Sequence, residues 1–202
     1  MGSRLIRRNK LDNYRVRPPG SPKNRLTGRV TRIIVGSVCS RGTSGWLRAG
    51  AVVVRCAFGK SGITHAKREG DGATPAGRFK LVGGYFRLDR IARPRSSVPL
   101  RVLNPMLGWC DESDAALYNR AITLPNRARH ETLWRADSLY DLFFVLDHNF
   151  CPRKRGKGSA IFFHLTHPDF GPTEGCVAIR ESDMRRLIPR LSHRVRFEIR
   201  GA

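Results

Sequence analysis

The stretch FHLTHPDFGPTEGCVAIR, residues 163–180, contains residue types that could form a reactive thiol with its base, a metal site, or an ordinary strand and turn. A thiol becomes a useful nucleophile when a nearby histidine accepts its proton, and a glycine before the cysteine allows the close backbone approach of an oxyanion hole. Here Gly175 precedes Cys176, and His164 stands twelve residues before the cysteine, after the apolar run AIFF. We expect a strand to aim His164 into a cleft and the intervening loop, held by two prolines, to bring Cys176 to it.

The same residues admit two other interpretations. A cysteine in a Gly-Cys turn is commonly a small buried residue without a catalytic role. A zinc site of His164, His167 and Cys176 requires tetrahedral convergence, whereas residues three apart on a strand point to opposite faces. We therefore expect no metal site, and we leave His148 and His167 without an assigned role.

The remaining cysteines give no further motif. The full set is Cys39, Cys56, Cys110, Cys151 and Cys176. They lie far apart without a Cys-x-x-Cys pair, which argues against a zinc ribbon or a thioredoxin-type redox site. Their odd number leaves at least one thiol free, and spacing does not reveal whether the others pair.

The chain carries a strong positive charge. Its 202 residues include 38 Lys and Arg against 16 Asp and Glu, for a formal net charge of +22. Such a field favours anionic partners, among them nucleic acid, acidic lipid and an acidic wall polymer, and charge alone does not choose among these. We expect no specific nucleic-acid partner, because the sequence contains no helix-turn-helix pattern, zinc-ligand spacing or RNP-like aromatic motif.

Composition divides the chain near residue 30. Residues 1–29 hold nine Lys and Arg and one acid, with Pro and Gly interruptions and no apolar run, which is typical of a flexible basic arm. Residues 30–202 suffice for one domain with a core. No secretory apolar region of about 7–15 residues opens the chain, and no run approaches the ~18 residues of a membrane span. We therefore expect no membrane span and no signal peptide in the chain as given.

Short apolar or alternating runs fill residues 30–202, with Gly or Pro about every 8–12 residues. Runs with this spacing predict a mainly β fold of the sandwich or barrel type. They are RIIVGSV, AVVVRCAFG, GRFKLVGGYF, VPLRVLNP, DLFFVLDHN, SAIFFHL and RVRFEIRG. The last run alternates apolar and charged residues, as a half-buried strand does.

One helix is predicted after residue 180, with Ser182 as its N-cap and Asp183 in its first turn. Its apolar residues recur with helical spacing: Met184, Leu187, Ile188 and Leu191. Pro189 is expected to kink this helix or to end it early.

Residues 104–138 lack a clear period, so we expect a long loop excursion from the sheet. Long excursions in compact domains are often lids or substrate-binding loops. The candidate substrate contacts in this segment are Trp109, Asp111, Tyr118, Asn119 and Arg120. The alternative is that these side chains pack the excursion onto the sheet.

Four segments, in this order, resemble the L,D-transpeptidase catalytic domain, also called the YkuD-like domain. They are REGDGATPAGRFKL (68–81), DLFFVLDHN (141–149), GSAIFFHL (158–165) and PTEGCVAI (172–179). The resemblance spans most of residues 30–200, and its specificity lies in the ordered combination. It implies a β-sandwich-like fold with a few short helices, and a cysteine acyltransferase that acts on peptidoglycan stem peptides without a metal or organic cofactor.

The resemblance also implies a role for each matching residue. Cys176 matches the nucleophile, His164 the base on the preceding strand, and Gly175 the glycine whose neighbouring amides stabilise the oxyanion. Thr173 stands where the family usually has Ser or Thr, and we expect it to contact the substrate. The segment 74–77, with Thr74, Pro75 and Gly77, matches a turn that opens a hairpin and is expected to be structural.

Two positions depart from the family's pattern. Glu174 replaces a common histidine, and Ala178 replaces an Arg or Asn, which together imply a divergent subgroup with altered substrate recognition. A carboxylate beside the nucleophile opposes thiolate formation. We therefore expect Glu174 to point away from the sulfur or to meet a cation, either the substrate's ammonium or an arginine such as Arg180.

The implied reaction is cleavage of an L,D peptide bond in a donor stem through a thioester, and transfer of the acyl group to an acceptor amine, which cross-links the cell wall. Water as acceptor makes the protein an L,D-carboxypeptidase or endopeptidase instead. A non-catalytic basic module that binds wall or nucleic acid is the alternative outside enzymes. The family implies a location in the periplasm or cell envelope, and we expect a monomer.

Overall fold

Strands dominate the computed structural model, which describes residues 28–37 and 42–201. The predicted basic arm, residues 1–29, lies outside the described residues up to residue 27, and so does Cys39. The strands are β1 (Val30–Ser37), β2 (Ser44–Ala49), β3 (Val52–Ala57), β4 (Ile63–Thr64), β5 (Thr74–Pro75), β6 (Gly77–Phe86), β7 (Leu100–Val102), β8 (Leu107–Cys110), β9 (Arg120–Thr123), β10 (His130–Thr132), β11 (Leu142–Leu146), β12 (Phe162–Leu165), β13 (Val177–Ile179) and β14 (Leu191–Arg200). The prediction of a mainly β fold is confirmed.

The largest sheet closes on itself. Its nine strands follow the order β11-β12-β13-β3-β2-β1-β14-β6-β7, and an additional pairing joins β11 to β6. Closure pairs strands that would otherwise be open edges. Every run predicted as a strand contributes to this sheet, and β12 and β13 pair parallel within it.

Strands β11 and β12 are buried along their whole length because each separates two cores. On β12, Phe163 and Leu165 belong to the larger core, whereas Phe162 belongs to a smaller core that also contains Cys176. Successive side chains on a strand point to opposite faces. His164 therefore lies on the same face as Phe162, toward Cys176.

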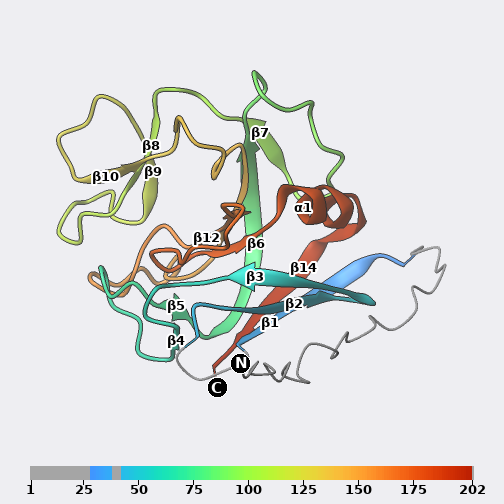
Figure 1. Ribbon diagram of the computed structural model, residues 1–202. Coiled ribbons are helices and arrows are strands. Elements are labelled where there is room, and N and C mark those ends of the chain that lie inside the picture. Colours follow the sequence, from blue (N-terminus) through green and yellow to red (C-terminus); the bar gives the residue numbers. More distant parts are fainter. Residues whose placement is uncertain (1–27, 38–41, 202) are drawn as a thin grey trace, which may run out of the picture.

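The excursion at residues 104–138 leaves the main sheet as expected, but it folds as a second sheet rather than as a loop. Strands β10, β8 and β9 pair antiparallel in that order, and they stand together at the upper left of Figure 1. Each has only three or four residues. Strands this short show too few alternations for a period to be visible in the sequence.

The predicted helix forms as α1 (Glu181–Leu187), followed by the 3₁₀ turn η1 (Ile188–Arg190), which contains Pro189. The prediction of Ser182 as N-cap is wrong. Because Arg180 is still extended after β13, it takes the N-cap position without a side-chain hydrogen bond, and Ser182 lies in the first turn. None of the helical segments that the structure describes is long and apolar enough to cross a lipid bilayer.

Candidate active site

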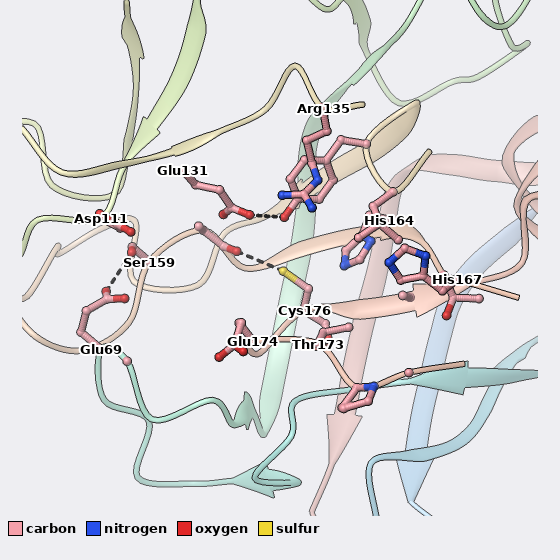
Figure 2. A pocket seen from close by; sticks show the side chains of 18 of the residues that line it. Glu69, Asp111, Glu131, Arg135, Ser159, His164, His167, Thr173, Glu174 and Cys176 are labelled. Carbon is pink, nitrogen blue, oxygen red and sulfur yellow. Dashed lines mark hydrogen bonds between the residues drawn. The ribbon is translucent and has the colours of Figure 1, made fainter. Parts of the chain in front are cut away.

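A cavity of about 570 Å³ lies between the ends of β12 and β13 and the small sheet of the excursion. Both Cys176 and His164 line it, and Figure 2 shows their side chains gathered at one side of the space. Its charged lining residues are Lys67, Glu69, Asp111, Arg129, Glu131, Arg135 and Glu174. Cations and carboxylates are thus intermixed in its lining.

The register of the parallel pair β12 and β13 places the cysteine and the histidine on one face. His164 pairs with Ala178, and Cys176 lies two residues before Ala178. Residues two apart on an extended chain point to the same side. The main chain of two neighbouring strands therefore brings Cys176 and His164 to the same cavity.

The thiol of Cys176 is held by two backbone groups. It donates a hydrogen bond to the Ala160 carbonyl at 3.2 Å and accepts one from the Phe162 N–H at 3.3 Å. Burial, together with the charge of Glu131, raises the pKa of the thiol, whereas the Phe162 N–H and the charge of Lys67 oppose this shift. The resting thiol is protonated at neutral pH and needs a base in order to react.

His164 is buried and its tautomer is defined by the backbone. Its Nδ1 lies 2.7 Å from the Leu165 carbonyl, which can only accept, so Nδ1 carries the proton and Nε2 the lone pair. The ring of Tyr140 packs edge-on against the imidazole at 5.2 Å between centroids. Burial lowers the pKa of His164 to about 4, against the raising effect of the Leu165 carbonyl. A neutral imidazole at neutral pH is able to accept the thiol proton.

Two threonine hydroxyls fix the turn that presents Cys176. Thr173 Oγ1 donates to the Cys176 carbonyl at 2.7 Å and accepts from the Gly175 N–H at 3.2 Å, and Thr74 Oγ1 donates to the same carbonyl at 3.3 Å. Gly175 has a φ of +135°, and a Cβ there would lie 2.8 Å from the Ala73 carbonyl oxygen. Both the backbone angle and the space therefore require glycine at this position.

Glu174 faces the cavity at its exposed rim. Its carboxylate pairs with the Lys60 ammonium at 2.8 Å, so the cation that it meets is Lys60 rather than Arg180. The guanidinium of Arg180 instead lies 4.9 Å from the centre of the Phe170 ring. Among the described residues that line the cavity, Arg180 does not occur.

Of the candidate contacts in the excursion, Asp111 is the one among the described residues that line the cavity. Trp109 and Tyr118 are buried, at 4% and 2% exposure, and Trp109 Nε1 donates to Asn119 Oδ1 at 3.0 Å. Tyr118 donates to the Glu69 carboxylate at 2.5 Å and so reaches the cavity through that residue. Arg120 lines a separate cavity of about 320 Å³ together with Trp109. Trp109, Tyr118 and Arg120 are not among the described residues that line the Cys176 cavity.

The histidines without an assigned role occupy different places. His167 is exposed and lines the cavity rim, whereas His148 lies outside it with Nε2 at 2.8 Å from the Lys157 carbonyl. Burial lowers the pKa of His148. Within the described part of the chain, no group of three or more His, Cys, Asp and Glu gathers as a metal site.

Sequence reasoning missed three cavity residues. Glu131 on β10, labelled in Figure 2, accepts a hydrogen bond from the Tyr140 hydroxyl. Both side chains line the cavity. Lys67 is 8% exposed and pairs with Asp71 at 2.5 Å. No period marks Glu131 or Tyr140, and Lys67 and Asp71 flank a turn, where helical spacing could not indicate their pairing.

Comparison with known proteins adds one finding. The sequence model of a family described as the L,D-transpeptidase catalytic domain, YkuD, matches residues 33–199. Searches of curated proteins and of solved structures found no significant match. The matched span includes Cys176, His164 and nearly the whole closed sheet.

Proposed function

The chain belongs to the L,D-transpeptidase (YkuD) family, and from that premise we propose that it is a peptidoglycan L,D-transpeptidase with Cys176 as nucleophile and His164 as base. The observation that carries the proposal is the placement of both side chains in one cavity by neighbouring parallel strands. The family supplies the substrate class, stem peptides of the cell wall, and with it a location in the periplasm or cell envelope.

Acylation begins with a change in the thiol's hydrogen bond. At rest the S–H group donates to the Ala160 carbonyl. To give its proton to His164 Nε2, the S–H group must first rotate away from that carbonyl. Nε2 takes the proton while Sγ forms a bond to the carbonyl carbon on the L-side of an L,D peptide bond. The carbonyl oxygen becomes an oxyanion, which backbone amides next to Cys176 stabilise; the Gly175 N–H is not among them, because it donates to Thr173 Oγ1.

The intermediate collapses when His164 returns a proton to the departing nitrogen. The C–N bond breaks, the D-amino acid leaves, and the donor remains as a thioester on Cys176. An acceptor amine then attacks the thioester carbonyl and gives its proton to His164. The C–S bond breaks, and the thiolate recovers the proton from the imidazolium.

The surroundings of Cys176 and His164 favour transfer of the thiol proton during the attack of the sulfur on the substrate carbonyl. They disfavour a thiolate–imidazolium ion pair formed before the attack. Burial raises the pKa of Cys176 and lowers that of His164, so both groups are neutral before substrate binds. Charge therefore develops mainly in the transition state, where preorganised dipoles have their greatest effect.

The acceptor decides between transpeptidase and carboxypeptidase. Purified sacculi incubated with the protein and then digested for muropeptide analysis are expected to gain L,D cross-links, whereas loss of terminal D-residues alone would identify hydrolysis. Absence of any change in the muropeptides would overturn the proposed function.

The nucleophile is tested with a matched pair of variants. Cys176→Ala is expected to abolish turnover and the covalent adduct that a carbapenem forms on the thiol, as seen in the intact-protein mass. Cys56→Ala removes the same sulfur from the larger core and should keep both. An adduct that persists in Cys176→Ala would place the nucleophile elsewhere.

A further inference from the structure

Two carboxylates of the cavity have cations of this chain as partners. Asp111 accepts from the Arg129 guanidinium at 2.9 Å, and Glu174 pairs with Lys60 at 2.8 Å. Such pairs leave little attraction for a further cation, because the charge of each carboxylate is already compensated. Neither residue is therefore a strong site for a positively charged ligand.

The other two cavity glutamates accept only neutral donors. Glu69 receives two of them, from the hydroxyls of Tyr118 at 2.5 Å and Ser159 at 2.8 Å. Glu131 receives one, from the Tyr140 hydroxyl, within the part of the chain that the structure describes. A carboxylate can accept about four hydrogen bonds, and among the four cavity carboxylates Glu131 is the one that accepts a single bond and has no cation of the described residues as its salt-bridge partner.

The guanidinium of Arg135 stands near Glu131 but is engaged elsewhere. It donates to the Asp137 carboxylate at 2.6 and 2.9 Å, and it lies 5.6 Å from the centre of the Tyr140 ring. Arg135 thus acts on Glu131 through space rather than by a hydrogen bond. The carboxyl of Glu131 retains the capacity to bind a cation.

The surroundings of Glu131 leave its carboxyl poised between two protonation states. Burial raises the pKa of Glu131 to about 7, and the charges of Asp111 and Glu69 act in the same direction. The Tyr140 hydroxyl and the charge of Arg135 oppose this shift. A cation placed against Glu131 would favour its charged form.

Glu131 also acts on the nucleophile. After burial, its negative charge is the largest influence that raises the pKa of the Cys176 thiol. A carboxylate in this place works against thiolate formation unless a cation compensates it. Among the described residues, the hydrogen-bond partner of Glu131 is the neutral Tyr140 hydroxyl, which does not compensate the carboxylate charge. A positively charged group of the substrate can compensate it.

We propose that Glu131 binds an ammonium group on the side chain of the stem residue that donates the acyl group, and thereby selects the donor stem. This inference rests on the proposed function and names the donor feature that the cavity reads. It assigns the donor ammonium rather than the acceptor amine, because the acceptor must lose its proton to attack, whereas the donor ammonium remains charged through both half-reactions.

The same contact couples recognition to reactivity. An ammonium against Glu131 neutralises the charge that opposes the thiolate of Cys176. When the donor lacks the ammonium, the charge of Glu131 continues to raise the pKa of the Cys176 thiol. A stem with the ammonium therefore binds to Glu131 and also neutralises the charge that hinders attack of the Cys176 thiolate on that stem.

The test measures binding apart from turnover. Two synthetic stem peptides are compared by calorimetry on the Cys176→Ala variant: one whose acyl-donating residue carries a free side-chain amine, and one with that amine acetylated. The free amine should bind about tenfold or more tightly, as expected for a charge-assisted hydrogen bond in a partly buried site. Adding Glu131→Gln should reduce this ratio to near one.

The control variants keep the comparison interpretable. Glutamine is isosteric with glutamate and still accepts from the Tyr140 hydroxyl, so the fold should persist. Glu181→Gln, in the exposed pair with Arg185 on α1, makes the same chemical change far from the cavity and should keep the tenfold ratio.

The inference is overturned if Glu131→Gln keeps the ratio of affinities for the free and the acetylated peptide. It is also overturned if the Cys176→Ala variant binds both peptides equally or binds neither. A collapse of the ratio on Glu131→Gln without any change in muropeptides would leave the ammonium site standing while the transpeptidase proposal fails. The two failures are thus distinguishable.

Discussion

The side-chain oxygen of Asn119 accepts a hydrogen bond of 3.2 Å from the backbone N–H of Ala160, the residue whose carbonyl accepts the Cys176 thiol. The Asn119 amide also donates to the carbonyls of His148 and Asn149 at 3.1 and 3.0 Å. Asn119 and Ala160 both have positive φ, at +53° and +52°. Asn119 is therefore a positioning residue, which fixes the strained backbone against which the thiol rests.

Replacement of Asn119 by alanine should destabilise the fold by about 3–5 kcal/mol, because several buried polar groups lose their partner at once. Urea unfolding at neutral pH measures this. The matched control is Asn126→Ala in an exposed turn, where only the Ala128 N–H loses a partner, and which should cost less than about 1 kcal/mol. Equal losses in the two variants would contradict the role assigned to Asn119.

Acidification should destabilise the protein through His164. Its folded pKa of about 4 lies below the ordinary value of 6.5, so the unfolded state binds a proton first as pH falls. Stability is unaffected above about pH 6.5 and declines toward pH 4, with about 2–3 kcal/mol lost from this group near pH 4.5. Between about pH 7.5 and 4.5, the free energy of unfolding should therefore fall by about 2–3 kcal/mol less in His164→Gln than in the wild type, as measured by urea unfolding.

Gly175→Ala should lower kcat/KM by about 10²-fold or more, since the added Cβ meets the Ala73 carbonyl and displaces the turn that carries Cys176. The backbone strain should also cost about 1–3 kcal/mol. Kinetics on a soluble stem peptide and thermal unfolding measure the two effects. Gly28→Ala, which adds a Cβ in open space, is the control and should change neither. A fully active Gly175→Ala variant would show that the turn tolerates displacement.

Asp71→Ala should destabilise the fold by about 3–5 kcal/mol, because it leaves the buried ammonium of Lys67 without its carboxylate partner. The double variant with Lys67→Met removes the unpaired charge and should recover part of the loss. Urea unfolding of both single variants and the double variant gives the coupling energy. Strict additivity would mean that the pair contributes no coupling.

Glu131→Gln should speed alkylation of Cys176 by iodoacetamide about three- to tenfold near pH 9, because it removes the charge that raises the thiol pKa. Glu174→Gln should change the rate far less, since the Glu174 carboxylate is exposed and paired with Lys60. Mass spectrometry of the alkylated protein gives both rates. A larger effect from Glu174→Gln would show that Glu174, not Glu131, governs the thiol.

Much of the main sheet could be predicted because its strands carry their own patterns. The run RVRFEIRG alternates, and β14 buries Val195, Phe197 and Ile199 as that alternation requires. The run SAIFFHL is apolar throughout because β12 is buried on both faces. The pattern alone did not reveal the two separate cores, since burial on both faces depends on what packs against each side.

The cavity was less accessible to prediction because it joins distant segments. The family pattern indicated Cys176 and His164, and the structure places both in the cavity. Glu131 and Tyr140 come from segments without a period, and their proximity arises only when the small sheet packs against β11 and β12. Trp109 was expected at the substrate, yet it lies behind the wall, because an aromatic ring in a short strand gives no sign of which face it takes.

The separate origin of the two sides of the cavity has a consequence for how this enzyme can be altered. Cys176 and His164 are set by the backbone pairing of β12 and β13, whereas Glu131 belongs to a sheet outside that pairing. On the proposed roles, the residues that give reactivity and the residue that gives selectivity thus lie on different segments of the chain. A graft that replaces residues 104–138 with the corresponding segment of another family member would exchange the stem that is accepted while leaving the spacing of nucleophile and base untouched.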